Sequence, residues 1–593
     1  MKKKIISLVL VFLLAVSYLT VLSVADGENY ESRQNVITPE LQEVIDSANS
    51  TDKIPVSVWT TEIDSEKVEQ LALEKTGFNK DSIRALVDQG KIETVTLEDV
   101  DKYIAAERAI YSEMQNEAHQ NFIKTIPFLA EACEKDSSFV SSYAPMMIVE
   151  LTKAEIKTLA KNNDVKEIYY SPDREIKEEM DTAIPSTRAD YTRDNGHLDG
   201  TGIRIGTIDL GTPFPNASIP SGQITRHEDS IRHTIHATMV SEIIMSNGEY
   251  KGVVPNATLY SAGTQGWTNG FVKAVDWLVS KNVHIINMSS GISSYTGQYT
   301  DYEKWTDHIA NNHSIHFVKS AGNSIDDNPN SYISAPGLAY NVITVGAIDD
   351  NGTLGFSDDI LFPGSCYVER ALNGIMPPNK PDLVAPGVNI ATDYIPSGDS
   401  GTSFSTPIVT GIVAQLIQQM PALATLQDLM KAILTASISH SVHQYDSDDP
   451  NFDKFGAGVV NAQDCTYTNY RGTFASSYFT SSQSNSYREY SFTATSADSK
   501  IRISLAWIKN VLHSGIPHSN NPNVVRPLAD LDLVVIAPDG TTVPLSNTVN
   551  ADNNTNLVVM QFNPATYGYG TYKVRVFIND STGANTYFGL VWW

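Results

Sequence analysis

Residues 401–407 (GTSFSTP) have the types that suit a nucleophilic serine at the start of a helix. The apolar run 408–417 follows at once and predicts that helix. Pro407 is expected in its first turn, where a missing N–H is tolerated. The positive end of the helix dipole would then stabilise negative charge that forms on a carbonyl oxygen beside Ser403. On its own, the motif also fits a helix that a serine merely caps.

A nucleophilic serine needs a histidine base, and the base needs a carboxylate to orient it. Residues 202–209 predict a short buried strand that ends in Asp209, and catalytic groups gather at such strand ends. His236 opens an apolar helical pattern, and a strand over 315–319 leads to Asn323, whose amide could donate to an oxyanion. Taken singly, each residue has a more ordinary explanation as a turn former or a surface histidine. Their joint occurrence in this order favours a catalytic site.

The four segments together resemble the subtilisin-like (subtilase) serine peptidases over about residues 187–463. The resemblance implies that Ser403 attacks a peptide carbonyl, that His236 is the general base and that Asp209 orients it. It also implies that Asn323 and the backbone N–H of Ser403 hold the oxyanion. His233 is a rival base, but it lacks the small residue and threonine that follow His236. The motifs that carry the resemblance are 208–211, 236–238, 321–323 and 401–407, with weaker matches at 286–291, 380–387 and 456–462.

The resemblance also implies a set of substrate-binding residues. One group would form an edge strand that pairs with the extended substrate backbone, and another would line the pocket for the residue before the scissile bond. The small side chains predict a roomy, permissive pocket, and no acidic residue is clearly placed to favour basic substrates. The edge-strand residues are Ser289, Ser290 and Gly291, and the pocket residues are Ser320, Ala321, Gly322 and Ser334.

Several positions depart from the family pattern. Leu210 stands where a threonine or serine is usual, Ala237 replaces a glycine and Met239 replaces a histidine. Glu242 also replaces a glycine, and Ser405 replaces an alanine. None of these changes removes a group that moves a proton, but they motivate an alternative: a catalytically impaired subtilase-fold pseudoenzyme that acts as a binding or scaffold protein.

The length, charge and cysteine count of the chain limit the classes of protein to which it can belong. The chain has 593 residues, 41% of them hydrophobic, so we expect several globular domains. A formal charge of −26 argues against a nucleic-acid partner. The three cysteines, Cys133, Cys366 and Cys465, exclude a disulfide framework, although the last two could pair. No cysteine and histidine cluster indicates a zinc site.

Residues 1–25 read as a signal peptide, because a lysine-rich start precedes an apolar run that ends in small residues. An uncleaved membrane anchor is the alternative, since the run is nearly long enough to span a bilayer. We therefore expect a secreted, extracellular protein without stable membrane insertion after cleavage.

Residues 26–185 predict an α+β domain with strands near 54–59, 144–151 and 165–170. The order of elements resembles the inhibitor-type propeptide of subtilases, whose tail, here about 171–184, would thread the active site. This resemblance implies that the segment is an intramolecular inhibitor and chaperone, removed by cleavage within 177–188. An unrelated N-terminal domain is the alternative. A helical insert over 94–133 is longer than such propeptides usually carry.

Residues 186–463 alternate strand and helix patterns, which predicts an α/β domain with a doubly wound parallel sheet. Residues 464–593 change to period two and predict an antiparallel β-sandwich. The sandwich resembles jelly-roll domains that are appended to many subtilases. It would stabilise the catalytic domain or bind substrate, and a carbohydrate-binding protein is a weaker alternative that rests on the sandwich alone.

No cofactor is required for the implied chemistry. Structural calcium is an expectation from the resemblance, and the acidic stretches 326–328 and 446–449 could supply oxygen ligands. Neither stretch has a diagnostic ligand spacing, so solvated loops are the simpler interpretation. The expected partners are protein or peptide substrates and the chain's own propeptide.

Overall fold

A computed structural model describes most of the chain from residue 36 onward. The described residues are 36–172, 176–177, 184–220, 222–227, 232–264, 266, 268–292, 299–323, 333–354, 358–368, 380–440, 452–466, 473–510, 516–518, 521–526, 529–544, 556–580 and 585–592. They form two compact units, one within Met1–Ile63 and Met114–Asp173 and the other within Asp64–Glu113 and Arg174–Trp593. The predicted signal peptide lies outside the described residues. Within them, no helix is both long and apolar enough to cross a membrane.

The first unit is built on an antiparallel sheet with the strand order β2-β3-β1-β4. Apolar side chains alternate along the central strand β1, where Val56 and Val58 are fully buried, so one face of the sheet carries the core. The strands predicted from the sequence are present. The elements are α2 (Pro39–Ser47), β1 (Lys53–Thr60), α6 (Pro127–Cys133), β2 (Phe139–Val140), β3 (Met146–Thr152), α7 (Lys153–Leu159) and β4 (Val165–Tyr170).

The second unit contains a ten-stranded, mostly parallel sheet, and the alternating pattern predicted a parallel sheet in this region. Its main path runs β15-β16-β14-β12-β11-β9-β6-β8-β7, and the pairs from β16 to β7 are parallel. The strands are β6 (Arg204–Asp209), β7 (Ile224–Arg226), β8 (Thr258–Gly263), β9 (Ile285–Met288), β11 (His316–Ser320), β12 (Ile343–Asp349), β13 (Ile360–Leu361), β14 (Leu383–Pro386), β15 (Ile438–His440) and β16 (Val459–Val460).

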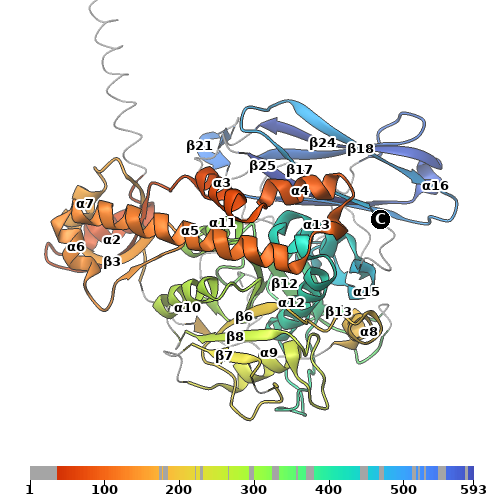
Figure 1. Ribbon diagram of the computed structural model, residues 1–593, viewed down its shortest axis with the longest axis horizontal. Coiled ribbons are helices and arrows are strands. Elements are labelled where there is room, and N and C mark those ends of the chain that lie inside the picture. The colour runs from red at the N-terminus through yellow and green to blue at the C-terminus, as the bar shows by residue number, and fades with distance from the viewer. Residues whose placement is uncertain are drawn as a thin grey trace, which may run out of the picture. The chain divides into compact units, whose positions relative to one another are not determined.

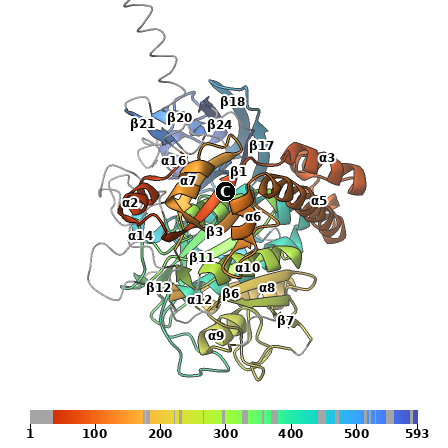
Figure 2. The ribbon, with the colours of Figure 1, turned by 90° about the vertical axis from the view of Figure 1, so that its left-hand side faces the viewer.

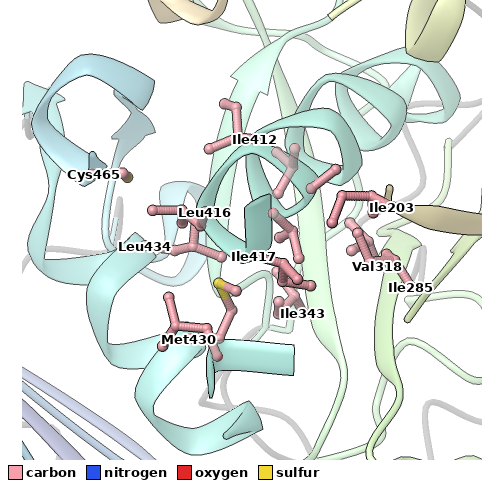
Figure 3. Packing of buried hydrophobic residues seen from close by; sticks show 14 of the residues in the cluster. Ile203, Ile285, Val318, Ile343, Ile412, Leu416, Ile417, Met430, Leu434 and Cys465 are labelled. Carbon is pink, nitrogen blue, oxygen red and sulfur yellow. The ribbon is translucent and has the colours of Figure 1, made fainter. Parts of the chain in front are cut away.

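Helices pack against this sheet, and α12 (Thr402–Gln419) is buried along almost its whole length. Figure 3 shows Ile412 and Leu416 of α12 in the same apolar cluster as Val318 and Ile343 of the sheet and Met430 of α13. A helix with apolar residues on every side over 408–417 is stable in this way because protein covers all of its faces. The other large helices are α8 (Ala189–Gly196), α9 (Ile235–Met245), α10 (Thr268–Ser280), α11 (Asp301–Asn312) and α13 (Gln427–Ala436).

The C-terminal region forms two antiparallel sheets with strand orders β17-β25-β19-β23 and β18-β24-β22, as the period-two pattern predicts. Strands β17, β18 and β24 of this region are labelled in Figure 2. Helix α13 packs on β19 and β25 so closely that a Cβ at Gly589 would lie 2.4 Å from the Cα of Leu429. The strands are β17 (Thr473–Phe479), β18 (Ser486–Ala494), β19 (Ile501–Trp507), β22 (Asp530–Ile536), β23 (Leu557–Phe562), β24 (Gly570–Asp580) and β25 (Thr586–Trp592). The sandwich therefore docks directly on a helix of the peptidase region.

Residues 64–113 belong to this second unit, although the sequence assigns them to one N-terminal domain over 26–185. They form α3 (Ser65–Thr76), α4 (Lys80–Asp88), a short 3₁₀ turn (Ile92–Thr94) and the first half of α5 (Leu97–Lys124), which Figure 1 shows as one continuous helix. We call them the 64–113 segment. Its apolar residues share one core cluster with the parallel sheet, among them Ile83, Val87, Val100 and Ile104.

Two buried arginines tie the 64–113 segment to the rest of its unit. Arg84 forms a two-bond ion pair with Asp428 of α13, at 2.7 and 2.8 Å, and donates to the Ser476 hydroxyl at 2.7 Å. Arg108 donates to the carbonyl oxygens of Val283 and His313, at 2.9 and 2.8 Å. A buried charge is stable only with such partners. The 64–113 segment is therefore an integral part of the second unit.

Candidate active site

The carboxylate and the imidazole predicted to act together lie in direct contact. Asp209 is the last residue of β6, and its Oδ2 lies 2.6 Å from Nδ1 of His236. Its Oδ1 accepts from the backbone N–H of Leu210 at 2.7 Å. Both side chains are buried, so an ionised Asp209 would hold the imidazole in the tautomer that carries its proton on Nδ1.

Local structure fixes the orientation of His236. Thr234 caps α9 by accepting from the backbone N–H of Ala237 at 3.1 Å, which places His236 in the first turn. The ring of Phe404 packs against the imidazole with centroids 5.5 Å apart. The rival histidine, His233, is instead 3.0 Å from the Thr212 hydroxyl through its Nδ1.

Ser403 is the second residue of α12, and it forms a reciprocal pair with Ser289. The Ser403 hydroxyl donates to the carbonyl of Ser289, and the Ser289 hydroxyl donates to the carbonyl of Ser403, each at 2.5 Å. The sequence predicted Pro407 in the first turn of this helix, and that prediction is wrong, because the helix already begins at Thr402. Pro407 is the sixth residue of the helix, four positions after Ser403. It lacks the backbone N–H that would otherwise donate to the Ser403 carbonyl. The Ser289 hydroxyl supplies the missing donor.

Asn323 lies at the N-terminus of the same helix. Its Oδ1 accepts from the backbone N–H of Thr402 at 3.0 Å, and the neighbouring Gly322 N–H donates to the Thr402 hydroxyl at 3.1 Å. Since the amide oxygen is engaged by the helix, the NH2 end of Asn323 is the end that could donate to a substrate oxygen. The amide and the helix N-terminus are thus brought together, which is the arrangement that an oxyanion site needs.

The residues that depart from the family pattern have structural partners. The Glu242 carboxylate is buried and accepts from the backbone N–H groups of Ser218 and Tyr394, both at 2.9 Å, so it joins two loops. The Ser405 hydroxyl donates to the Thr402 carbonyl at 2.8 Å. Ala237 and Met239 are buried in the domain core. At Leu210 only the backbone N–H donates to Asp209, because the side chain has no hydroxyl.

The predicted substrate-binding residues also come together. β10 (Gly291–Ile292) pairs with β5 (Ile176–Lys177) in an antiparallel arrangement that sets Lys177 opposite Gly291. The tail of the N-terminal segment therefore occupies the edge strand that was predicted to bind substrate. Behind that strand, a Cβ at Gly291 would lie 2.3 Å from the Ser334 hydroxyl, and one at Gly322 would lie 3.2 Å from it.

Ser290, the remaining edge-strand residue, has its hydroxyl 3.3 Å from the carbonyl of Ile208. Ala321 accepts from the backbone N–H of Ser334 at 3.0 Å, which joins the two sides of the predicted pocket. Ser320, Ala321 and Ser290 are all fully buried.

Sequence reasoning missed one polar residue at this place, Lys319 on β11. Its ammonium donates to the carbonyl and the hydroxyl of Ser320, at 2.5 and 2.8 Å, and to the Ser334 hydroxyl at 2.9 Å. The side chain is 1% exposed. The available signal was a lysine within a strand that was expected to lie in the buried parallel sheet, because such a side chain is costly to bury without polar partners.

The part of the chain that the structure describes contains no cluster of three or more potential metal-ligating side chains. The acidic stretches 326–328 and 446–449 lie outside the described residues. Cys366 and Cys465, which the sequence left as a possible pair, are both buried and form no disulfide with each other. Cys133 is partly buried and is likewise not in a disulfide. The thiols of Cys366 and Cys465 face different carbonyls, those of Gly364 and Ser437.

The central part of the chain is similar to known proteins. The model of the subtilase family (Peptidase_S8) matches residues 200–461. Serine protease AprX of Bacillus subtilis is 28% identical over 53% of this chain and 77% of its own length. A thermostable alkaline protease of Halalkalibacterium halodurans is 26% identical over 54% of this chain and 82% of its own.

Among solved structures, the prenylagaramide maturation protease PagA is similar at 20% identity and a TM-score of 0.38, over 46% of this chain and 96% of that one. The family match includes the strand of Asp209, the helix of His236 and the start of α12. Residues 200–461 of this chain are therefore a serine peptidase domain of the subtilase family.

Proposed function

We propose that the protein is a secreted serine endopeptidase that is made as a zymogen and hydrolyses peptide bonds through an acyl-enzyme. The observation that carries this proposal is the 2.6 Å contact between Asp209 and His236. It lies in a domain whose α12 starts at Thr402, with Ser403 in the first turn. A carboxylate, an oriented imidazole and a serine at a helix N-terminus are the parts of a catalytic triad.

The reaction would begin when Ser403 turns from the Ser289 carbonyl toward His236. The imidazole takes the hydroxyl proton as Oγ bonds to the substrate carbonyl carbon, and Asp209 stabilises the imidazolium that results. The negative carbonyl oxygen would be held by the Asn323 NH2 group and by the Ser403 backbone N–H. His236 then protonates the leaving amine, and a water molecule repeats the sequence to release the acid.

The pairing of β5 with β10 supports the zymogen part of the proposal. An extended chain that pairs with Gly291 and Ile292 competes with a substrate for the backbone of the predicted edge strand. Cleavage within 177–188 would free that strand. Most of this segment lies outside the described residues, so the cleavage site itself is argued from the sequence.

A subtilase-fold pseudoenzyme is the second candidate function, and the reciprocal bonds of Ser403 and Ser289 are the observation that favours it. A hydroxyl held by a carbonyl at 2.5 Å is not poised to lose its proton to a base. Activity therefore requires a rotation of Ser403 that a pseudoenzyme would not make.

Labelling with a fluorophosphonate probe separates these candidates. The secreted protein and its Ser403→Ala variant are compared, and the mature N-terminus is read from the same sample. Labelling of the parent alone, with a new N-terminus near residue 185, is the expected result. A well-folded protein that stays unlabelled after an added protease has trimmed its N-terminal segment would be a pseudoenzyme.

A further inference from the structure

Residues 333–341, which we call the 333–341 segment, run from the predicted substrate pocket to the C-terminal sandwich. Near its start, the backbone N–H of the predicted pocket residue Ser334 donates to the Ala321 carbonyl at 3.0 Å. The next residue, Ala335, exchanges two backbone hydrogen bonds with Ile292 of β10, at 3.0 and 3.1 Å. The start of the segment therefore contacts both the predicted pocket and the predicted edge strand.

The other end of the segment is held by the sandwich. The Lys509 backbone N–H donates to Oδ1 of Asn341 at 2.8 Å, and Nδ2 of Asn341 donates back to the Lys509 carbonyl at 2.9 Å. Nδ2 of Asn556 donates to the Tyr340 carbonyl at 2.8 Å. Lys509 follows β19 and Asn556 precedes β23, so these bonds all come from one end of a single sheet of the sandwich.

A buried ammonium group lies at this junction. Nζ of Lys509 is 3.6 Å from the ring centroid of Tyr299 and 4.7 Å from that of Tyr340. The Asp307 carboxylate of α11 accepts from the backbone N–H groups of Asn341 and Tyr340, at 2.6 and 3.1 Å. It also accepts from the Tyr299 hydroxyl at 2.9 Å. Because a buried ammonium needs such surroundings, Lys509 fixes where the end of the segment lies.

The two ends of the segment are joined by a short, packed stretch of chain. The Gly337 N–H donates to the Ser334 carbonyl at 2.8 Å, and the Gly337 carbonyl accepts from the Thr344 hydroxyl at 2.6 Å. The side chains of Ile333 and Leu338 are buried in one apolar cluster that also contains Ala321 of the predicted pocket. Close-packed interiors transmit displacements, so a shift at one end of the segment moves the other.

Resting on the proposed peptidase function, we propose that Lys509 and Asn556 are positioning residues through which the C-terminal sandwich sets the substrate pocket and the edge strand. Loss of their contacts would let the 333–341 segment shift and would weaken the binding of an extended peptide. The proposed triad lies on β6, α9 and α12, outside the segment, and would keep its geometry. The sandwich would thus act on substrate binding without touching the substrate.

The test compares two reactions of the mature enzyme. One is cleavage of a peptide that extends several residues before the scissile bond, and the other is labelling of Ser403 by a small fluorophosphonate without a peptide chain. Lys509→Met removes the ammonium but keeps much of the side-chain volume. We expect KM for the peptide to rise about tenfold, because small displacements at a binding site have effects of at least this size. The value of kcat and the labelling rate should stay unchanged, since only substrate binding is weakened.

A second variant keeps the test decisive if Lys509→Met does not fold. Asn556→Ala leaves the Tyr340 carbonyl with another donor, because Nζ of Lys431 also donates to it, at 2.7 Å. This variant should therefore fold, and its KM should rise in the same direction as that of Lys509→Met, again with an unchanged labelling rate.

Two controls separate this role from a general effect of sandwich docking. Arg502 of β19 donates to the carbonyls of Ala436 and Ile438, at 2.9 and 2.8 Å, and neither belongs to the 333–341 segment. Arg502→Met should lower the thermal stability and leave KM as in the parent. Lys573→Met changes a lysine of β24 whose side chain is 50% exposed, and it should change neither quantity.

A parental KM in the folded Lys509 and Asn556 variants overturns the proposal, and so does an equal rise in KM for Arg502→Met. Either result would mean that the sandwich only stabilises the domain. A parent enzyme that is neither labelled nor able to cleave any peptide overturns the peptidase function instead.

Discussion

Ser289 and Ser403 exchange two hydrogen bonds, each hydroxyl donating to the other residue's carbonyl at 2.5 Å. The pair links β9 and the strand segment after it to the start of α12. It also resolves the local problem that Pro407 creates, because the proline leaves the Ser403 carbonyl without its helical donor. The backbone of Ser403, the proposed nucleophile, is thus held by a residue of the predicted substrate-binding edge.

Ser289→Ala should destabilise the domain and lower activity. The Ser403 carbonyl would become a buried acceptor without a donor, which costs about 1–3 kcal/mol. Urea unfolding in a Ser403→Ala background, which prevents self-digestion, measures the loss. Ser290→Ala is the matched control, since the Ser290 hydroxyl makes only a longer contact of 3.3 Å with Ile208. Equal losses in the two variants would contradict the assigned role of Ser289.

Asn323→Leu should lower kcat by about 10²–10³ with little change in KM, because the lost donor acts only on the charge that forms in the transition state. Asn323→Asp keeps an acceptor for the Thr402 N–H and so preserves the helix start. It should be as stable as the parent and yet as slow as the leucine variant. Steady-state kinetics on one peptide measure kcat and KM of the parent and both variants. A rise in KM without a fall in kcat would contradict the role of Asn323 as an oxyanion donor.

Arg84→Met should destabilise the protein by about 3–5 kcal/mol, because it leaves the Asp428 carboxylate buried without its partner. Lys102→Ala breaks an ion pair with Glu98 whose two side chains are both exposed to solvent, so it should leave stability almost unchanged. Thermal unfolding of both variants, in the Ser403→Ala background, gives the comparison. A small effect of Arg84→Met would mean that the 64–113 segment is only loosely held.

Cleavage within 177–188 should produce two chains that stay together. The N-terminal chain would retain the bonds of Arg84 and Arg108 and its share of the common apolar core. Native size-exclusion chromatography should therefore give one peak that denaturing electrophoresis resolves into two bands. A mature enzyme that elutes without its N-terminal chain, and remains active and folded, would contradict this.

Glu303→Gln should make stability less dependent on pH. Burial raises the pKa of Glu303 from 4.5 to about 7, so the folded protein binds one more proton than the unfolded chain between those values. Stability consequently falls as pH rises through that window. The glutamine variant should match the parent near pH 4 and exceed it at pH 8 by at most about 3 kcal/mol. Urea midpoints at both pH values measure this, and a parent curve without that slope would refute it.

Sequence patterns predicted the architecture where one physical rule decides the outcome. The apolar run before Asp209 and the alternation after residue 464 can each be satisfied by one kind of element, and both were found. Helix α11 was not predicted, because its polar residues, including Glu303 and Asp307, are buried by tertiary packing that no local pattern shows.

At the site, the sequence predicted which residues could act but not how they are held. The start of α12 was placed too late, since a proline normally marks a first turn and the compensating donor, Ser289, is 114 positions away. Lys319 was overlooked because its acceptors include Ser334, 15 positions further along the chain. The helical insert predicted over 94–133 covers part of α5, but the sequence did not identify the surface against which the 64–113 segment would pack.

The pairing of Arg84 with Asp428 joins positions 344 apart, and its bond to Ser476 joins positions 392 apart. Contacts of such long range form late, because the intervening chain must first be synthesised and then brought together. During synthesis, the 64–113 segment is complete long before either partner exists. The 64–113 segment therefore cannot form these bonds until Asp428 and Ser476 have been synthesised. The peptidase domain gains its full set of contacts only after the C-terminal sandwich has folded against it.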